Sequence, residues 1–346
     1  MKRFMVFFVC LVIILGLFLN SSSTALSVKN SLELCINTLI PSLFPFMAIS
    51  LFMSFSGAGD IFSFILSPFT KYFLHIPKEL GQTVFFSLIG GYPAGARLLG
   101  SLVNEKRISP FDAGTLLGFC VSPGPTFVVL AVGKGMFGSA KTGVIFLISQ
   151  LCASLLTGAL LCRKNPLSTT KIICKTNSLY ISFIQAVSQS SSGILTIVSY
   201  VVLVSAILGS FGELNNSNTA AILFSLSEVT SGCSIAASLG GIFSFLLASF
   251  LLSFGGISVC CQIAALAAEY SIPIRTFVIS RFACGGLSAL FTFVLIKLFP
   301  DASHVFAQIT SPIAASSGSR VVGAVCLCVM IAITFSKASL SENVDF

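Results

Sequence analysis

Residues 90–98 read GGYPAGARL and residues 122–127 read SPGPTF, and each is a break rich in small residues or proline within an apolar stretch. Comparable breaks occur in the second half of the chain, where residues 227–234 read SEVTSGCS and residues 253–258 read SFGGIS. Irregular backbone at membrane depth persists only where protein buries it or where it lines a polar cavity, because lipid cannot bond its N–H and C=O groups. Two pairs of breaks therefore predict a duplicated site, as in secondary transporters built from two repeats.

The composition places the chain in a membrane. Hydrophobic residues make up 55% of its 346 residues and charged residues 9%, whereas a soluble domain has about 25% charged residues. The net charge of +8 comes from short clusters of Lys and Arg between apolar windows, which is typical of orientation signals, so we exclude nucleic acid as a partner. The 12 cysteines include no Cys-x-x-Cys pair, which favours buried thiols over disulfides or metal ligands.

The first apolar run, residues 4–19, follows Lys2 and Arg3 and is about as long as the hydrophobic part of a signal peptide. Because no convincing small-x-small cleavage site follows it, we interpret it as a retained first transmembrane helix. Cleavage as a signal peptide is the alternative.

The remaining apolar windows are each able to hold the roughly 20 residues of a membrane span. They cover residues 31–57, 80–103, 110–132, 141–162, 180–211, 218–239, 241–268, 274–299 and 319–336. Windows 80–103 and 218–239 carry a central GYPAG or TSG break, so we predict that each is a re-entrant hairpin that returns to the side it came from.

The predicted fold class is an all-α polytopic membrane protein with two inverted repeats, each with a re-entrant hairpin and a broken transmembrane helix. Three crossings per repeat is an odd number, which inverts the second repeat relative to the first. The predicted parts are an N-terminal transmembrane helix with a short loop (1–29), repeat 1 (30–162), a basic cytoplasmic loop (163–179), repeat 2 (180–299), and a loop, C-terminal transmembrane helix and tail (300–346).

The distribution of basic residues supports this topology with a cytoplasmic N-terminus. It places the richest basic loop, with Arg163, Lys164, Lys171 and Lys175, in the cytoplasm, as the positive-inside rule requires. If both hairpins were full spans, this loop would lie outside, so we reject that arrangement.

Three linked motifs resemble one family. Residues 38–50 read TLIPSLFPFMAIS, residues 87–109 read SLIGGYPAGARLLGSLVNEKRIS and residues 118–129 read GFCVSPGPTFVV. In combination they resemble the sporulation integral membrane protein YlbJ family, over roughly residues 30–300. The resemblance implies two nucleoside-recognition or gate domains, related to the core of concentrative nucleoside transporters. It also implies a role in endospore formation, in which dipicolinic acid crosses the outer forespore membrane.

A dianion such as dipicolinate needs N–H groups, helix N-terminal ends and cations around it. In the first repeat the candidate binding residues are Gly91, Tyr92, Pro93, Gly95, Arg97, Ser122, Pro123, Gly124 and Thr126. Arg97 offers a bidentate match to a carboxylate, and the alternatives are that it reaches the membrane surface or pairs with Asp112 or Glu105. Tyr92 is either a stacking surface for an aromatic ring or an interfacial anchor.

The second repeat adds Glu228, Thr230, Ser231, Ser253, Gly255, Gly256 and Ser258. Glu228 is a candidate for taking up a proton, or for binding sodium or substrate with Ser227, Thr230 and Ser231; the alternative is a structural carboxylate. The residues from Ser253 to Ser258 alternatively serve close helix packing. Arg275 and Arg281 are interpreted as orientation or surface-reaching residues.

No hydrolase, zinc-protease, Walker or dinucleotide motif stands in a credible context, so we expect no enzyme and no cofactor. His75 and His304 lie in connecting segments without a second ligand, so no metal site is expected. Three functions remain: a small-anion transporter, a transporter of a nucleoside or other polar metabolite, and a non-transporting assembly component of spore maturation. The expected partners are the organic anion, the lipid bilayer and a coupling proton or sodium ion, and a homo-oligomer is left open.

Overall fold

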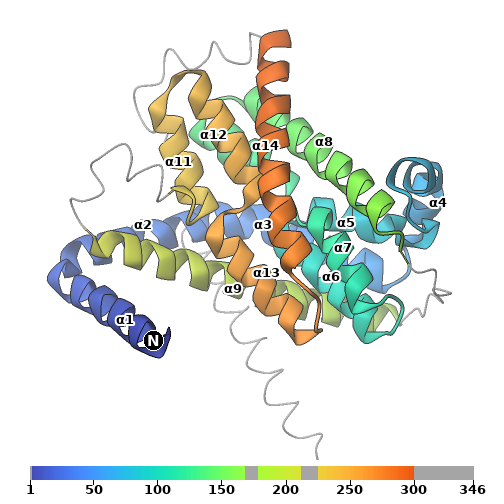
Figure 1. Cartoon of the computed structure of the whole chain (residues 1–346), viewed down its shortest axis with the longest axis horizontal. Coiled ribbons are helices and arrows are strands. Elements are labelled where there is room, and N and C mark those ends of the chain that lie inside the picture. The colour runs from blue at the N-terminus through green and yellow to red at the C-terminus, as the bar shows by residue number, and fades with distance from the viewer. Residues whose placement is uncertain (1, 168–177, 212–224, 300–346) are drawn as a thin grey trace, which may run out of the picture.

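A computed structural model describes residues 2–167, 178–211 and 225–299 (Figure 1). Within these ranges all regular structure is helical, which confirms the all-α class. The first half contains α1 (Lys2–Leu19), α2 (Ser21–Leu34), η1 (Cys35–Leu39), α3 (Ile40–Phe55), α4 (Asp60–Phe69), η2 (Thr70–Leu74), η3 (Lys78–Leu80), α5 (Gly81–Gly90), α6 (Tyr92–Asn104), α7 (Pro110–Cys120), η4 (Phe127–Met136) and α8 (Ala140–Lys164). The second half contains α9 (Leu179–Ser210), α11 (Val229–Leu239), α12 (Gly241–Phe254), α13 (Gly256–Glu269) and α14 (Arg275–Leu298).

Five helical stretches of the described chain are long and apolar enough to cross a membrane. They are Ser21–Phe55, Ala140–Lys164, Leu179–Ser210, Gly241–Glu269 and Arg275–Leu298. The apolar helices Arg3–Leu19, Phe127–Met136 and Val229–Leu239 are shorter. The chain is therefore an integral membrane protein with several spans. The predicted C-terminal helix, part of the basic loop and the first residues of the second predicted hairpin lie outside the described residues.

The segment after the first helix is helical, although the sequence predicts a short loop there. Helix α2 begins at Ser21 and continues through the π-helical η1 into α3, which makes one long interrupted helix. The turn between α1 and α2 is held by Asn20, whose Nδ2 donates to the carbonyl oxygen of Ser210 over 2.7 Å. Helix α1 therefore packs against α9, at the edge of the molecule in Figure 1.

The two halves of the chain interlock through their long helices. Helix α14 packs against both α8 and α12, and α9 packs against α2 and α3 (Figure 1). Helix α13 packs against α6. Each half contributes a long helix, short helices that meet at breaks, and a further long helix, in that order. This interlocking brings breaks that are far apart in the sequence to one place.

Three of the four breaks lie at the start of the stretch that the sequence predicts. The first predicted hairpin is interrupted at Gly91, with φ +92°, and the residues that follow form the first turn of α6. In the second predicted hairpin, the sequence places the break at the TSG triplet. The triplet instead lies in the first turn of α11, because Glu228 before it caps the helix. In the first broken span, the irregular residues are 121–124, and Thr126 is already helical.

Candidate functional site

The two breaks of the first half contact each other. A Cβ added at Gly91 would lie 3.6 Å from the backbone nitrogen of Gly124, and one added at Gly124 would lie 3.4 Å from the carbonyl oxygen of Ile89. A positive φ suits glycine at position 91, because an L side chain rarely adopts this conformation. The two backbones therefore lie close to each other at the breaks, and the positive φ accounts for glycine at position 91.

The two breaks of the second half are joined by backbone hydrogen bonds. The N–H of Ile257 donates to the carbonyl oxygen of Leu226 over 3.0 Å, and the N–H of Ser258 donates to that of Ser227 over 2.9 Å. These N–H groups belong to the first turn of α13, which has no earlier turn to bond with. The start of α13 therefore positions the turn that leads into α11.

Tyr92 links the breaks of the two halves. Its side chain is buried, and its hydroxyl donates to the carbonyl oxygen of Leu252 over 2.6 Å. A Cβ added at Gly255 would lie 3.5 Å from the Tyr92 ring. Because the last carbonyls of α12 have no partner within the helix, this hydrogen bond satisfies a group that lipid cannot. Burial rules out the interfacial position that the sequence left open for Tyr92.

Changing Tyr92→Phe is expected to lower the free energy of unfolding by about 1–2 kcal/mol, because a buried carbonyl loses its donor. The measurement is the thermal unfolding midpoint of the purified protein in detergent. Tyr180→Phe is the matched control, since Tyr180 is exposed. Equal midpoints for the Tyr92→Phe protein and the wild type would contradict this role of the hydroxyl.

Arg281 of α14 carries a positive charge at the meeting point of the breaks. Its side chain is only 1% exposed. Nη1 donates to the carbonyl oxygens of Val121 and Ser253, the latter over 3.2 Å, and Nη2 donates to that of Gly118 over 2.8 Å. Nε is buried without an acceptor, and within the described ranges no carboxylate pairs with this guanidinium.

This position overturns the interpretation of Arg281 as an orientation or surface-reaching residue. The guanidinium bonds carbonyls of α7, of the residues after α7 and of α12, and thus joins both halves of the chain. A buried cation without a paired anion is expensive in an apolar interior, and such residues in membrane proteins are commonly functional.

Gln150 of α8 supports the break at residues 121–124. Its Nε2 donates to Ser122 Oγ and to the carbonyl oxygen of Pro123, each over 3.2 Å. The sequence analysis did not single out this buried glutamine. The carbonyl of Pro123, which lies in the irregular stretch, is therefore satisfied by a neighbouring helix.

Glu228 caps the N-terminus of α11. Its side chain is 2% exposed, and its two carboxylate oxygens accept hydrogen bonds from the backbone N–H of Thr230 (2.9 Å) and of Ser231 (2.7 Å). Carboxylates are favoured here because the first N–H groups of a helix lack partners and the helix dipole is positive at this end. Within the described chain, no Lys or Arg forms an ion pair with Glu228.

Arg97 lies on the face of α6 that is directed to α9 and to the end of α13. It is half-buried, and its Nη2 donates to Ser192 Oγ over 3.1 Å. Glu269 and Tyr270 are its electrostatic neighbours. Neither Asp112 nor Glu105 bonds it, so the pairing considered from the sequence is not formed. Its contacts place it with these residues rather than with Arg281.

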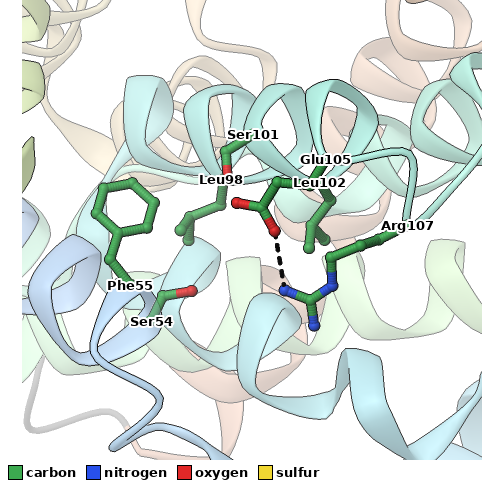
Figure 2. Close-up of a pocket in the computed structure, with 7 residues that line it drawn as sticks. All are labelled: Ser54, Phe55, Leu98, Ser101, Leu102, Glu105 and Arg107. Carbon is green, nitrogen blue, oxygen red and sulfur yellow. Dashed lines mark hydrogen bonds and ion pairs between the residues drawn. The ribbon is translucent and has the colours of Figure 1, made fainter. Parts of the chain in front are cut away.

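A separate pocket lies at the end of α6. Figure 2 shows the guanidinium of Arg107 directed toward the carboxylate of Glu105, with an N–O distance of 3.4 Å between Nη1 and Oε2. Ser54 and Ser101 add hydroxyl groups to its lining. Because the two charges pair with each other, this pocket does not provide the unpaired cation that an anion requires.

The structure brings most of the predicted residues together. Gly91, Tyr92, Pro93, Ser122, Pro123, Gly124, Glu228, Thr230, Ser253, Gly255, Gly256 and Ser258 are buried at or beside the breaks. Gly95 is buried against α7, whereas Thr126 and Ser231 are half-buried at helix starts and Arg97 lies apart. The sequence analysis did not name Gln150 and Gln262, and it did not assign Arg281 to the site. The available signal was the position of each within an apolar window, where polar residues are rare.

One curated relative was found. The sporulation integral membrane protein YlbJ of Bacillus subtilis (strain 168) is 29% identical over 130 residues, which are 38% of this chain and 32% of the relative. The match thus spans about a third of that relative's length. It confirms the resemblance to the YlbJ family that the three motifs indicate. No protein-family model and no solved structure matches the chain.

Proposed function

We propose that this protein is a sporulation membrane transporter that moves a small organic anion, with dipicolinic acid as the candidate substrate, across the outer forespore membrane. The observation that carries the proposal is the buried Arg281 guanidinium at the meeting point of the helix breaks. A guanidinium matches a carboxylate in shape and charge. The sporulation context comes from the name of the Bacillus subtilis relative.

Alternating access is the mechanism that we propose for this site. Transporters of this type bind substrate where discontinuous helices of two repeats meet, and two inverted repeats then open the site to each side in turn. The repeated order of elements supports this mechanism. In an inverted arrangement, the short helices before each break would form the two re-entrant hairpins.

A small cavity lies beside Tyr92 and Glu228, and Arg281 is not part of its lining. In this cavity, the centre of a water molecule can occupy a volume of only about 20 Å³. This is room for about one water. An aromatic dianion needs a larger space. The proposal therefore requires a second conformation in which the halves separate at the Tyr92–Leu252 hydrogen bond.

Deleting the gene in a sporulating strain is expected to lower spore dipicolinate while synthesis in the mother cell continues, because the anion cannot cross a bilayer unaided. The measurement is the dipicolinate content of spores and of mother cells. Complementation with the wild-type gene is expected to restore the spore content.

The control is uptake of radiolabelled dipicolinate by proteoliposomes that contain the purified protein, compared with empty liposomes. Normal spore dipicolinate in the deletion strain, or uptake no faster than in empty liposomes, would overturn the proposal. The nucleoside and assembly functions would then take its place.

A further inference from the structure

Helix α4 and its continuation η2 expose an apolar face and bury hydroxyl groups. The exposed side chains recur with the period of a helix, and they are Ile61, Phe64, Ile65, Phe69, Tyr72 and Phe73. Ser63 and Thr70 are buried on the other side. Ser63 Oγ accepts from the N–H of Gln82 over 3.0 Å, and Thr70 Oγ1 donates to the carbonyl oxygen of Ser67 over 3.1 Å. The apolar face is therefore directed away from the protein.

The two segments together are too short to span a membrane. The 10 residues of α4 and the 5 of η2 are about 22 Å long, whereas the hydrocarbon core is about 30 Å thick. Both ends are polar, since Asp60 Oδ1 accepts from Gln82 Nε2 over 3.0 Å and Lys71 is exposed in the last turn. A short helix with one apolar face and polar ends is typical of the membrane–water interface.

Four exposed basic residues flank this face. Helix α8 packs against η2, and Figure 1 shows the C-terminal end of α8 beside α4. That end carries Arg163 and Lys164. Lys71 belongs to η2, and Lys78 to η3, which packs against both α4 and η2. Within the part of the chain that the structure describes, none of the four forms a salt bridge. We call these four residues the basic corner.

The combination of unpaired cations and an apolar face matches an anionic phospholipid. Lys and Arg bind phosphate, and acyl chains cover apolar side chains. Lys71 Nζ lies 5.6 Å from the centre of the Tyr72 ring, and both residue types are typical of the interface. The sequence predicts that this end of α8 is cytoplasmic, and the cytoplasmic leaflet carries the anionic lipids. A second copy of the chain docked here would instead bring like charges together.

We propose that α4 and η2 lie flat at the membrane surface, and that the basic corner binds the phosphate of an anionic phospholipid whose acyl chains cover the apolar face. This lipid would connect α4 and η2 to the end of α8. Because it binds only the folded protein, it is expected to stabilise the fold. The inference does not depend on the substrate, since the basic corner lies outside the helix breaks.

The first test measures lipid binding. The full-length protein is purified in an uncharged detergent, and its thermal unfolding midpoint is followed as lipid is added. The additions are phosphatidylglycerol, phosphatidylcholine with the same acyl chains, and inorganic phosphate. Phosphatidylglycerol is expected to raise the midpoint saturably and further than the other two. An equal rise with phosphatidylcholine would overturn the role of charge, and an equal rise with inorganic phosphate would overturn the lipid as the ligand.

A double variant locates the binding site. Lys71→Gln combined with Arg163→Gln removes one cation from each side of the basic corner. The phosphatidylglycerol concentration that gives half of the rise is expected to increase about 30-fold. Lys134→Gln combined with Lys141→Gln is the matched control, because both residues are exposed and Lys141 lies about 35 Å from Lys164 along α8. This control loses the same charge and is expected to respond as the wild type does. Equal responses of the two double variants would overturn the location.

The second test measures how α4 and η2 lie in the membrane. The chain contains no Trp, so a single introduced Trp gives the only indole fluorescence. Phe64→Trp and Tyr72→Trp place it at two positions of the exposed face, about 12 Å apart along the helix. Each variant is reconstituted with phosphatidylcholine that carries bromine at shallow or at deep acyl carbons. If the helix lies flat, shallow bromine is expected to quench both variants more strongly than deep bromine.

Leu290→Trp is the control for depth. Leu290 is exposed on the spanning helix α14, so deep bromine is expected to quench this variant most strongly. Different depths at positions 64 and 72 would contradict a helix that lies flat. Absence of quenching at both positions would show that protein covers the face, and would overturn the lipid as its partner.

Discussion

Replacing Arg281 with methionine is expected to reduce dipicolinate uptake by about 100-fold, since the loss of a charge-assisted contact to a carboxylate corresponds to about 3 kcal/mol. Methionine keeps a long side chain and removes both the charge and the donors. Arg281→Lys keeps the charge, but it cannot reproduce the planar fork that reaches the carbonyls of Val121, Ser253 and Gly118. Uptake by the lysine variant is expected to lie between that of the methionine variant and the wild type.

Both variants also lose hydrogen bonds that hold the halves together, so uptake is compared at equal amounts of folded protein. The measurement is the initial rate of uptake into proteoliposomes as a function of dipicolinate concentration. Arg275→Met is the matched control, because Arg275 lies exposed at the start of the same helix. Wild-type kinetics in the Arg281→Met protein would remove Arg281 from the anion site. An equal loss in the Arg275→Met protein would show that the effect is not specific to the breaks.

Gly95→Ala is expected to destabilise the protein more than a methyl group added at any other glycine discussed above. A Cβ at position 95 would overlap the carbonyl oxygen of Cys120 and lie 3.2 Å from its carbonyl carbon. These are backbone atoms of α7, which cannot rotate away as a side chain can. Helices α6 and α7 would have to separate, so we expect a loss of about 3 kcal/mol in the free energy of unfolding. The measurement is the unfolding midpoint in detergent.

Gly286→Ala is the matched control for this prediction. Gly286 lies within α14, and a Cβ there would meet nothing within 4 Å in the described structure. Alanine in the interior of a helix is favoured over glycine by about 1 kcal/mol, so this variant is expected to be as stable as the wild type or more stable. If Gly95→Ala unfolds at the same temperature as Gly286→Ala, the close contact between α6 and α7 is not needed for folding.

The helical membrane architecture could be predicted from composition and from the length of the apolar windows. Windows 141–162, 180–211 and 274–299 each correspond to one long helix of the structure, α8, α9 and α14. Such predictions succeed because lipid requires the backbone to satisfy its own hydrogen bonds. The position of each break was less predictable, since a small residue such as Gly232 suits the first turn of a helix as well as a break.

The roles of individual polar residues depended on contacts between segments far apart in the sequence. Arg97 and Arg281 are both arginines within apolar windows, and the sequence favoured Arg97 because it follows a glycine-rich motif. The structure places Arg97 beside Ser192 and Arg281 against the carbonyls of two breaks. Helical period alone cannot distinguish them, because two of the partners of Arg281, Gly118 and Val121, lie more than a hundred residues away.

The sequence by itself determined that the chain spans a membrane as helices, that these helices are interrupted near Gly91, Ser122, Glu228 and Gly255, and that the chain resembles the YlbJ family. Those properties follow from local composition and motif, because apolar length and glycine or proline act over a few residues. Only the tertiary structure decided that the interruptions meet, that Tyr92 and Arg281 join the halves there, and that Glu228 lines a cavity. These depend on which helix packs against which, and that is set by side-chain shape and hydrogen bonding across the whole fold.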